Sequence, residues 1–316
     1  MTEMADKKDE ELKAEELDTK EKDETREEKG GRAKKLWKKL SFRAKFWLVI
    51  LLLFLVSLPG YLLGLTVRTY EVKDERIHGS LRIALITDLH SCNYGKGQSK
   101  LLSAIEEQHP DVILLGGDIF DDKLSDEKAE EFLSGIAGKY PCYYVTGNHE
   151  YWAGKDALIE KMGILMKYQI PWLAGDSVLL DTGVGTVRLC GIDDPDSVLA
   201  PILGNYDMEF VELRDSISKE EFTILLTHRP ERFDAYIQEG FDLVLAGHAH
   251  GGQVRIPGIM NGFYAPNQGL FPKYAGGRYE KDGTIMIVSR GLAKESTPFP
   301  RFCNPPEIVI INLSGK

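Results

Sequence analysis

Short apolar runs recur along most of the chain after residue 80, each bounded by Gly, Pro or polar residues. Runs of this length are typical of strands that are buried in a sheet. The predicted strands are 81–87, 112–115, 142–146, 187–192, 222–227, 243–246, 285–289 and 308–312. Apolar residues with helical spacing lie between many of them, at 100–108, 125–136, 157–168, 208–217 and 231–238. The alternation predicts an α/β domain with largely parallel pairing, and the Gly-, Pro- and aromatic-rich stretch 256–277 predicts a long loop.

A different pattern occupies residues 46–67, which are 22 consecutive residues without a charge. At about 1.5 Å per residue, a helix of this length spans a hydrocarbon core of roughly 30 Å. A cleaved signal peptide would have a shorter apolar region and an A-x-A-like site, which is missing here. A buried core helix would be apolar on one stripe rather than on every face. The pattern therefore predicts a transmembrane helix from Phe46 to Val67.

The charge is unevenly distributed around this segment. Residues 1–29 hold 13 acidic and 7 basic residues, whereas residues 32–45 hold 7 Lys or Arg and no acid. The positive-inside rule predicts a single-pass protein with a cytoplasmic N-terminus and an extracytoplasmic domain. We expect residues 1–45 to be a disordered acidic leader with a basic flank.

Charge and cysteine content argue against three classes of protein. The net charge of -10 argues against a nucleic-acid partner, because phosphate contacts need a basic face. The four Cys residues are scattered and form no CxxC pair, which argues against a disulfide scaffold and a structural zinc site.

Polar residues that commonly bind metals follow five of the predicted strands. Ligands gather beyond the carboxyl ends of strands in α/β sheets. In D-x-H and H-x-H, a near-extended backbone would return both side chains to one side. A lone His at a strand end is more often structural, but five of the seven His residues belong to these clusters. The candidates are Asp88, His90, Asp118, Asn148, His149, Glu150, His228, His248 and His250. Mixed imidazole and carboxylate ligands favour Mn, Fe, Zn or Co over Ca.

The ordered series D-x-H, G-D-x-x-D, G-N-H-E, H and G-H-x-H resembles the calcineurin-like metallophosphoesterase superfamily. The blocks GHAHGGQVRIP at 247–257, SRGL at 289–292 and PPEIVIINL near the end resemble its bacterial membrane-anchored branch, the YkuE- and YaeI-like phosphodiesterases. The resemblance implies a four-layer α-β-β-α sandwich, here preceded by one transmembrane helix, with residues 68–316 as the catalytic domain. It also implies two divalent transition-metal ions as cofactors, with manganese among the candidates.

The resemblance assigns roles to the candidate residues. One metal would be held by Asp88, His90, Asp118 and His250, and the second by Asp118, Asn148, His228 and His248. Asp118 would bridge the two ions, and a hydroxide between them would attack phosphorus. His149 would stabilise the developing charge or protonate the leaving oxygen. Glu150 and Asp121 would orient ligands by hydrogen bonds, although for Asp121 a turn-capping role is equally compatible with the sequence.

The implied function is hydrolysis of a phosphodiester or pyrophosphate bond, with a lipid or a UDP-sugar-lipid among the candidate substrates. One alternative is a protein Ser/Thr phosphatase, but Asp122 stands here at the position of the Arg that those enzymes carry after G-D-x-V-D, and Lys123 at the position of the Gly that follows it. Another is a non-catalytic membrane scaffold, which the complete set of ligand positions argues against. Gln253 and Arg255 are candidate substrate contacts, with a surface salt bridge as the other role for Arg255. For the loop aromatics (Phe263, Tyr264, Phe271 and Tyr274), packing onto the domain is favoured over contact with a nucleotide or acyl chain.

Overall fold

The computed structural model describes residues 40–48, 51, 64–180, 187–199, 206–214, 217–294 and 300–316. Contacts divide the chain into two units, Met1–Leu58 and Pro59–Lys316. Residues 42–48 of the first unit are helical. The predicted acidic leader and most of the predicted membrane segment (49–50 and 52–63) lie outside the described residues. Within the part of the chain that is described, there is no helix with the length and apolar character needed to cross a bilayer.

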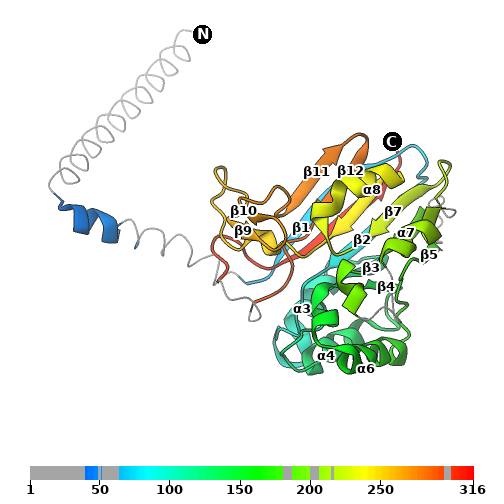
Figure 1. Ribbon diagram of the computed structural model, residues 1–316, viewed down its shortest axis with the longest axis horizontal. Helices are drawn as coiled ribbons and strands as arrows, with labels where there is room; N and C mark the ends of the chain where they lie inside the picture. Colours follow the sequence, from blue (N-terminus) through cyan, green and yellow to red (C-terminus); the bar gives the residue numbers. More distant parts are fainter. Residues whose placement is uncertain are drawn as a thin grey trace, which may run out of the picture. The chain divides into compact units, whose positions relative to one another are not determined.

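Two β-sheets lie at the centre of the second unit (Figure 1). The first has the strand order β1-β13-β2-β3-β4, and the second has the order β11-β12-β8-β7-β6-β5. The strands of the first sheet are β1 (Thr66–Lys73), β13 (Glu307–Ser314), β2 (Ser80–Ile86), β3 (Val112–Gly116) and β4 (Cys142–Val145). Those of the second are β11 (Gly277–Lys281), β12 (Thr284–Val288), β8 (Leu243–Ala246), β7 (Phe222–Leu226), β6 (Val187–Gly191) and β5 (Ser177–Leu180). Within the first sheet, β2, β3 and β4 are parallel to one another, and within the second sheet so are β12, β8, β7 and β6.

Apolar side chains on both faces of the inner strands explain the stacking of the sheets. In β2, Ile83 and Leu85 pack between the two sheets, whereas Ala84 and Ile86 face the opposite side. Successive side chains of a strand point to opposite faces, so a sheet with unbroken apolar runs needs a packing layer on each of its two faces. The second sheet covers one face and helices cover the other.

Helices form the two outer layers. The outer face of the first sheet packs against α3 (Ser99–Glu106), α4 (Glu127–Ile136) and α6 (Lys155–Lys167). The outer face of the second sheet packs against α7 (Tyr206–Arg214) and α8 (Phe233–Glu239). Figure 1 shows α3, α4 and α6 grouped on one side and α8 on the other, near β12. The α/β class and the expected α-β-β-α layers are therefore confirmed.

The eight predicted strands and five predicted helices all occur, with ends that shift by a few residues. The sequence prediction missed several short elements: the strands β5, β11, β9 (Tyr264–Ala265) and β10 (Gly269–Leu270), and the helix α5 (Asn148–Trp152). The predicted loop 256–277 is thus interrupted by the small β9–β10 pair. These elements have two to five residues each, too few to show a period in the sequence.

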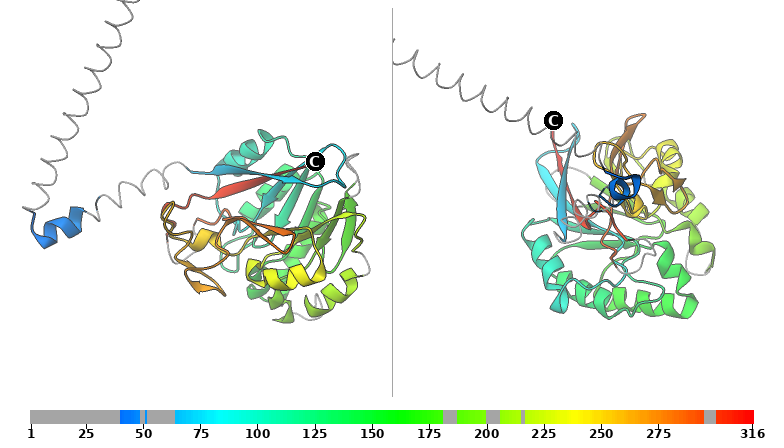
Figure 2. Two further views of the ribbon diagram at one scale, coloured as in Figure 1. Left: turned by 90° about the horizontal axis from the view of Figure 1, so that it is seen from above. Right: turned by 90° about the vertical axis from the view of Figure 1, so that its left-hand side faces the viewer.

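Strand β1 corrects the predicted boundary at residues 67 and 68. It begins at Thr66 and pairs in parallel with β13 along its whole length, as Figure 2 shows for the cyan and red strands. Thr66 and Val67 were assigned to the membrane helix, but they belong to this strand. The prediction missed β1 because only Val72 is fully buried, so no apolar run marks the strand. The structured domain therefore begins ahead of residue 68.

A truncation tests the contribution of β1. A version that starts at Gly64 keeps the strand, and a version that starts at Asp74 lacks it. We expect the shorter version to lose about 1.5–3 kcal/mol of unfolding free energy from Val72 alone, and more from the lost pairing with β13. Urea denaturation of both versions measures the difference. Equal unfolding midpoints would show that β1 adds nothing to the fold.

Candidate metal centre

The candidate ligands lie at the carboxyl ends of strands from both sheets. Asp88 and His90 follow β2, Asp118 follows β3, and His228 follows β7. Asn148, His149 and Glu150 form the start of α5 directly after β4, and His248 and His250 follow β8. All of them are buried except His149, which is partly exposed. Residues that are far apart in the sequence, such as Asp88 and His248 with a separation of 160 positions, therefore lie together at one edge.

The backbone at these strand ends is not extended, contrary to the expectation for D-x-H and H-x-H. Asp88 and His90 have φ values of 52° and 48°, and His248 and His250 have values of 67° and 46°. Asp118 also has a positive φ, of 52°. These left-handed conformations are uncommon for residues with a side chain and are found at functional sites. The paired side chains enter one site because the chain turns sharply after each strand.

Two glycines let these turns approach each other. A Cβ on Gly147 would lie 2.2 Å from Oδ1 of Asp118, and a Cβ on Gly247 would lie 2.6 Å from Oδ2 of Asp88. Both distances are shorter than any real contact, so a larger residue would displace the two carboxylates. The glycines before N-H-E and H-x-H are therefore part of the site.

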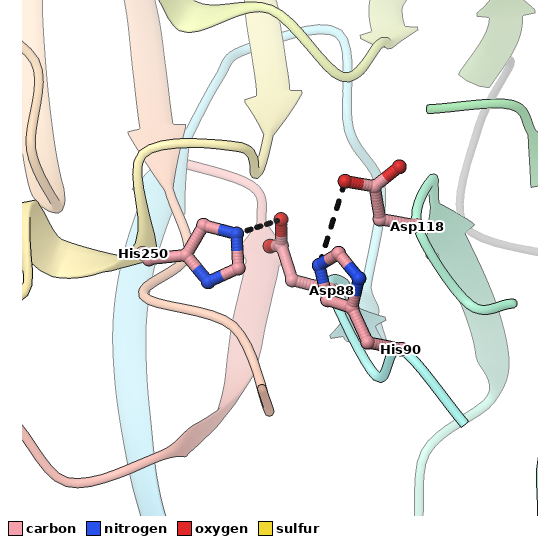
Figure 3. Close-up of side chains that lie close together, drawn as sticks. All are labelled: Asp88, His90, Asp118 and His250. Carbon is pink, nitrogen blue, oxygen red and sulfur yellow. Dashed lines mark ion pairs between the residues drawn. The ribbon is translucent and has the colours of Figure 1, made fainter. Parts of the chain in front are cut away.

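Four side chains from three strand ends form a first cluster (Figure 3). Nε2 of His90 lies 3.5 Å from Oδ2 of Asp118, and Nε2 of His250 lies 3.6 Å from Oδ1 of Asp88. One ligand atom from each of these four residues lies within 4.8 Å of those of the others. That spacing allows one metal ion to be bound by all four.

Asp118 belongs also to a second cluster with His228 and His248. Oδ2 of Asp118 lies 3.1 Å from Nε2 of His228. Nδ1 of His228 lies 2.9 Å from the carbonyl oxygen of Gly116, which can only accept, so Nδ1 carries a hydrogen and Nε2 is the ring nitrogen that points toward Asp118. Nδ1 of His248 lies 3.2 Å from that Nε2. Asn148 lines the same pocket as Asp118 and His248.

Several buried polar atoms at the centre have no hydrogen-bond partner among the described residues. They are Oδ2 of Asp88, Nε2 of His90, Oδ2 of Asp118, Oδ1 of Asn148 and Nδ1 of His250. Buried polar atoms are nearly always paired, because an unpaired one loses its hydration without compensation. Oxygen and imidazole nitrogen atoms left unpaired in this way fit the donor set of divalent transition metals.

The imidazole of His149 is held by two carboxylates. Its Nδ1 lies 2.6 Å from Oδ1 of Asp122 and 3.4 Å from Oδ1 of Asp121. Burial by itself lowers the pKa of His149, but hydrogen bonding to Asp121 and the negative charges of Asp118 and Asp122 outweigh it and raise this pKa to about 9. The ring of His149 therefore favours the protonated form, in which it can donate a proton.

Asp121 combines the two roles that the sequence left open. Its Oδ1 lies 3.0 Å from Nδ1 of His90, which fixes that ring with Nε2 toward Asp118. Its Oδ2 accepts hydrogen bonds of 3.0 Å from the backbone N–H groups of Lys123 and Leu124, which caps the turn.

Glu150 binds backbone rather than a ligand side chain. Its carboxylate accepts hydrogen bonds from the N–H groups of Gly147, Asp118 and Phe120 at 2.7, 3.0 and 3.1 Å. Glu150 thereby joins the turn after β4 to the turn after β3. Burial raises the pKa of its carboxyl to about 7.

Two polar residues near the centre, Asp122 and Asn267, were not predicted from the sequence as members of the site. Asp122 holds His149, and Oδ1 of Asn267 lies 2.9 Å from Nε2 of His248. Arg229 donates to Asn267 at 2.7 Å and to Asp194 at 2.7 Å. Arg229 is thus engaged in a buried ion pair and is oriented by it. A single sequence offers no periodicity or motif that would single out Asn267.

A pocket of about 650 Å³ opens onto the centre. Its inner end is formed by polar groups that include Asp118, Asn148 and His149, and its outer walls are mostly apolar. The wall residues include Trp152, Val254, Phe263, Tyr264, Pro266 and Leu270. Of the two candidate substrate contacts, Gln253 lines this pocket, whereas Arg255 is not among its lining residues and donates to Asn261 instead.

For the four loop aromatics, the sequence predicted packing onto the domain, and this prediction is wrong for three of them. Tyr274 is buried, but Phe263, Tyr264 and Phe271 are exposed. Tyr274 packs against Phe233 in the outer core of the second sheet, whereas the exposed rings of Phe263 and Phe271 pack against each other, with 5.8 Å between their centroids.

Comparison with known proteins identifies the family. The family model of calcineurin-like phosphoesterases matches residues 81–252. An uncharacterized metallophosphoesterase of Campylobacter jejuni is 30% identical, covering 85% of this chain and 69% of its own length. The metallophosphoesterase YkuE of Bacillus subtilis is 27% identical, covering 81% of this chain and 90% of its own. A transmembrane protein with a metallophosphoesterase domain from Bos taurus is 28% identical over 73% of this chain, and this chain spans only 53% of its length.

Proposed function

This chain belongs to the calcineurin-like phosphoesterase family of metal-dependent phosphoester hydrolases, and on that premise we propose that its buried centre holds two divalent metal ions and hydrolyses a phosphodiester or pyrophosphate bond. The observation that carries the proposal is the position of Asp118, whose carboxylate belongs to both ligand clusters. A carboxylate is suited to this place because it offers two anionic oxygens.

The ligand sets follow from the unpaired atoms. Asp88, His90, Asp118 and His250 would hold one ion. Asp118, His228 and His248 would hold the other, with Oδ1 of Asn148 as a further donor. Metal ions bound there supply Lewis acidity toward a phosphoryl oxygen and lower the pKa of water.

His149 would act on the leaving group. It lines the pocket with Asp118 and His250, and it belongs to a third group of possible ligands, with His90 and Asp121, rather than to either of the two clusters that share Asp118. Nδ1 of His149 is hydrogen-bonded to Asp122, so the other ring nitrogen, Nε2, points away from that carboxylate. A protonated imidazole in this place can donate a hydrogen to the oxygen that leaves phosphorus.

The alternative functions are less well supported. A protein Ser/Thr phosphatase would need an Arg near the phosphate. Arg229 is held by Asp194 and Asn267, so it is already neutralised. A non-catalytic scaffold has no need for unpaired buried polar atoms, because their desolvation lowers the stability of the fold.

Membrane attachment is a further part of the proposal. The uncharged segment 46–65 would anchor the chain, with the basic flank 32–45 on the cytoplasmic side and the hydrolase domain on the other. The Bos taurus relative named as a transmembrane protein is consistent with such an arrangement. The substrate would then be a lipid-linked phosphodiester or pyrophosphate, such as a UDP-sugar lipid, at the membrane surface.

The shared ligand gives the first test of the metal centre. We expect purified protein to contain close to two transition-metal ions per chain, and Asp118→Asn to deplete both because each site loses a ligand. Elemental analysis measures the content. Asp234→Asn is the matched control, because Asp234 binds Lys281 at the surface. An Asp118→Asn protein that keeps two ions would refute the shared site.

The role of His149 is tested by a separate variant. His149→Ala should lower kcat by roughly 10²- to 10⁴-fold, the scale of general acid catalysis, and leave the metal content near normal. Steady-state kinetics with bis-p-nitrophenyl phosphate and elemental analysis measure the two effects. Loss of metal from this variant would make His149 a ligand instead.

The orientation is tested by proteolysis. Protease added to intact cells or spheroplasts should digest the domain from Thr66 onward and spare the N-terminal leader. Antibodies against each part detect the products. A domain that is protected until the membrane is lysed would place the hydrolase in the cytoplasm.

The substrate class is tested by comparing kcat/KM for three substrates. These are bis-p-nitrophenyl phosphate, p-nitrophenyl phosphate and phospholipids in mixed micelles, each with the full chain and with a version that starts at Gly64. We expect the diester to be preferred over the monoester, and the full chain to be the more active of the two on lipids because an anchor raises the local substrate concentration. Best activity on the monoester and none on lipids would argue against a membrane substrate.

A further inference from the structure

Large apolar side chains are exposed along the segment that follows the last pair of ligands. Ile259 is 83% exposed, Phe271 67% and Leu270 60%. Together with three neighbours they form what we call the apolar rim. Its members are Ile256, Ile259, Phe263, Tyr264, Leu270 and Phe271. Clusters of this kind on a protein surface mark contact sites for membranes or partner molecules.

Backbone hydrogen bonds hold the rim in place. The N–H of Phe271 donates to the carbonyl of Phe263 at 2.8 Å, and the N–H of Phe263 donates to Gly252 at 2.9 Å. The N–H of Ile256 and the carbonyl of Met260 form a further bond of 3.0 Å. The exposure of these side chains is therefore built into the fold, next to the turn that carries His250.

The rim continues into the pocket. Phe263, Tyr264 and Leu270 line the pocket whose inner end is formed by Asp118 and His250. The rim and the wall of the pocket thus share three apolar side chains.

Strand β1, which follows the uncharged segment 46–65 in the sequence, begins near the same edge of the domain. The N–H of Thr66, the first residue of β1, donates to the carbonyl of Pro306 at 2.9 Å. Two residues before Pro306, Asn304 donates to the carbonyl oxygens of His250 and Gln253 at 2.7 and 3.2 Å. Figures 1 and 2 both show the start of β1 and the β9–β10 pair at one end of the domain.

The charge of the rim is also suited to a lipid surface. From residue 256 to residue 277 the sequence has no acidic residue and one basic residue, Lys273, although the whole chain has a net charge of -10. Anionic head groups would therefore meet no repulsion from this segment.

We propose that the apolar rim is a membrane-contact surface that inserts into the acyl-chain boundary of the bilayer to which segment 46–65 is anchored. The proposal rests on the membrane attachment proposed above. Apolar side chains that lie in such an interface reach roughly 5–10 Å below the head groups. Contact of the rim with the bilayer brings the mouth of the pocket to the lipid surface, so a lipid-linked substrate can move along the apolar wall to the centre while its chains stay out of water.

A depth measurement with the full chain tests this surface. Cys303 is partly exposed, so it is replaced by Ser, while Cys92, Cys142 and Cys190 are buried. A single Cys is then placed by Ile259→Cys or by Phe271→Cys and labelled with a nitrobenzoxadiazole dye. Neither residue lines the pocket. The matched control is Met166→Cys, because Met166 in α6 is 78% exposed and belongs to the opposite outer layer.

The labelled proteins are reconstituted into vesicles of phosphatidylcholine and phosphatidylglycerol, with and without doxyl-labelled lipid. We expect the doxyl lipid to quench both rim labels and shift their emission to the blue, and to leave the label at position 166 unchanged. Rim labels as unquenched as the control overturn the proposal, and so does shielding from aqueous iodide without quenching by doxyl lipid, which would indicate a second copy or a protein partner.

Two further readouts separate this inference from the proposed function. Hydrolysis of bis-p-nitrophenyl phosphate by the labelled chains reports folding and chemistry, and flotation with the vesicles reports the anchor. Quenching of the rim labels in a chain without hydrolytic activity would support the surface and contradict the proposed reaction. A chain that fails to float would contradict both the anchor and the membrane-contact surface.

Discussion

The arrangement of this domain depends on one constraint, which is the burial of acidic and imidazole groups that keep individual atoms without a hydrogen-bond partner among the described residues. Asp88 and Asp118 are almost completely buried, and each leaves an oxygen without a hydrogen bond among the described residues. An isolated buried carboxylate would be strongly destabilising. The surrounding imidazoles reduce that cost, and a divalent cation would remove more of it. The unpaired atoms therefore lower the stability of the fold at the place where they could bind a metal ion.

The two-sheet architecture supplies the rigidity that such a centre needs. Its ligands come from strands of both sheets, so their spacing depends on the packed layer of apolar residues between them. Tight turns after β2, β3 and β8 then bring the side chains inward through left-handed residues. Glu150 ties two of these turns together through backbone hydrogen bonds. Strain of this kind persists only where the surroundings determine the conformation fully.

The fold could be predicted from the sequence where burial leaves a continuous apolar run, as in β2, β3, β7 and β8. It could not be predicted for β1, because an edge strand with one fully buried residue resembles a linker. The clustered ligands were predictable because each follows an apolar run, although the extended backbone invoked to bring them together was wrong. Asp122 and Asn267 could not be predicted as site residues, because their role comes from contacts with His149 and His248 that form only in the folded chain.

The apolar rim is exposed, whereas the metal centre needs water to be excluded, and both lie at the same edge of the domain. The centre needs exclusion of water around its charged groups, because a low dielectric strengthens every interaction with a phosphate. A pocket with mostly apolar walls provides that exclusion, but its mouth then presents apolar side chains such as Leu270 to water. A soluble enzyme would have to cover this mouth with a lid or a partner. In the membrane-anchored arrangement proposed above, the bilayer would cover this mouth, so that the surface which excludes water would also deliver the substrate.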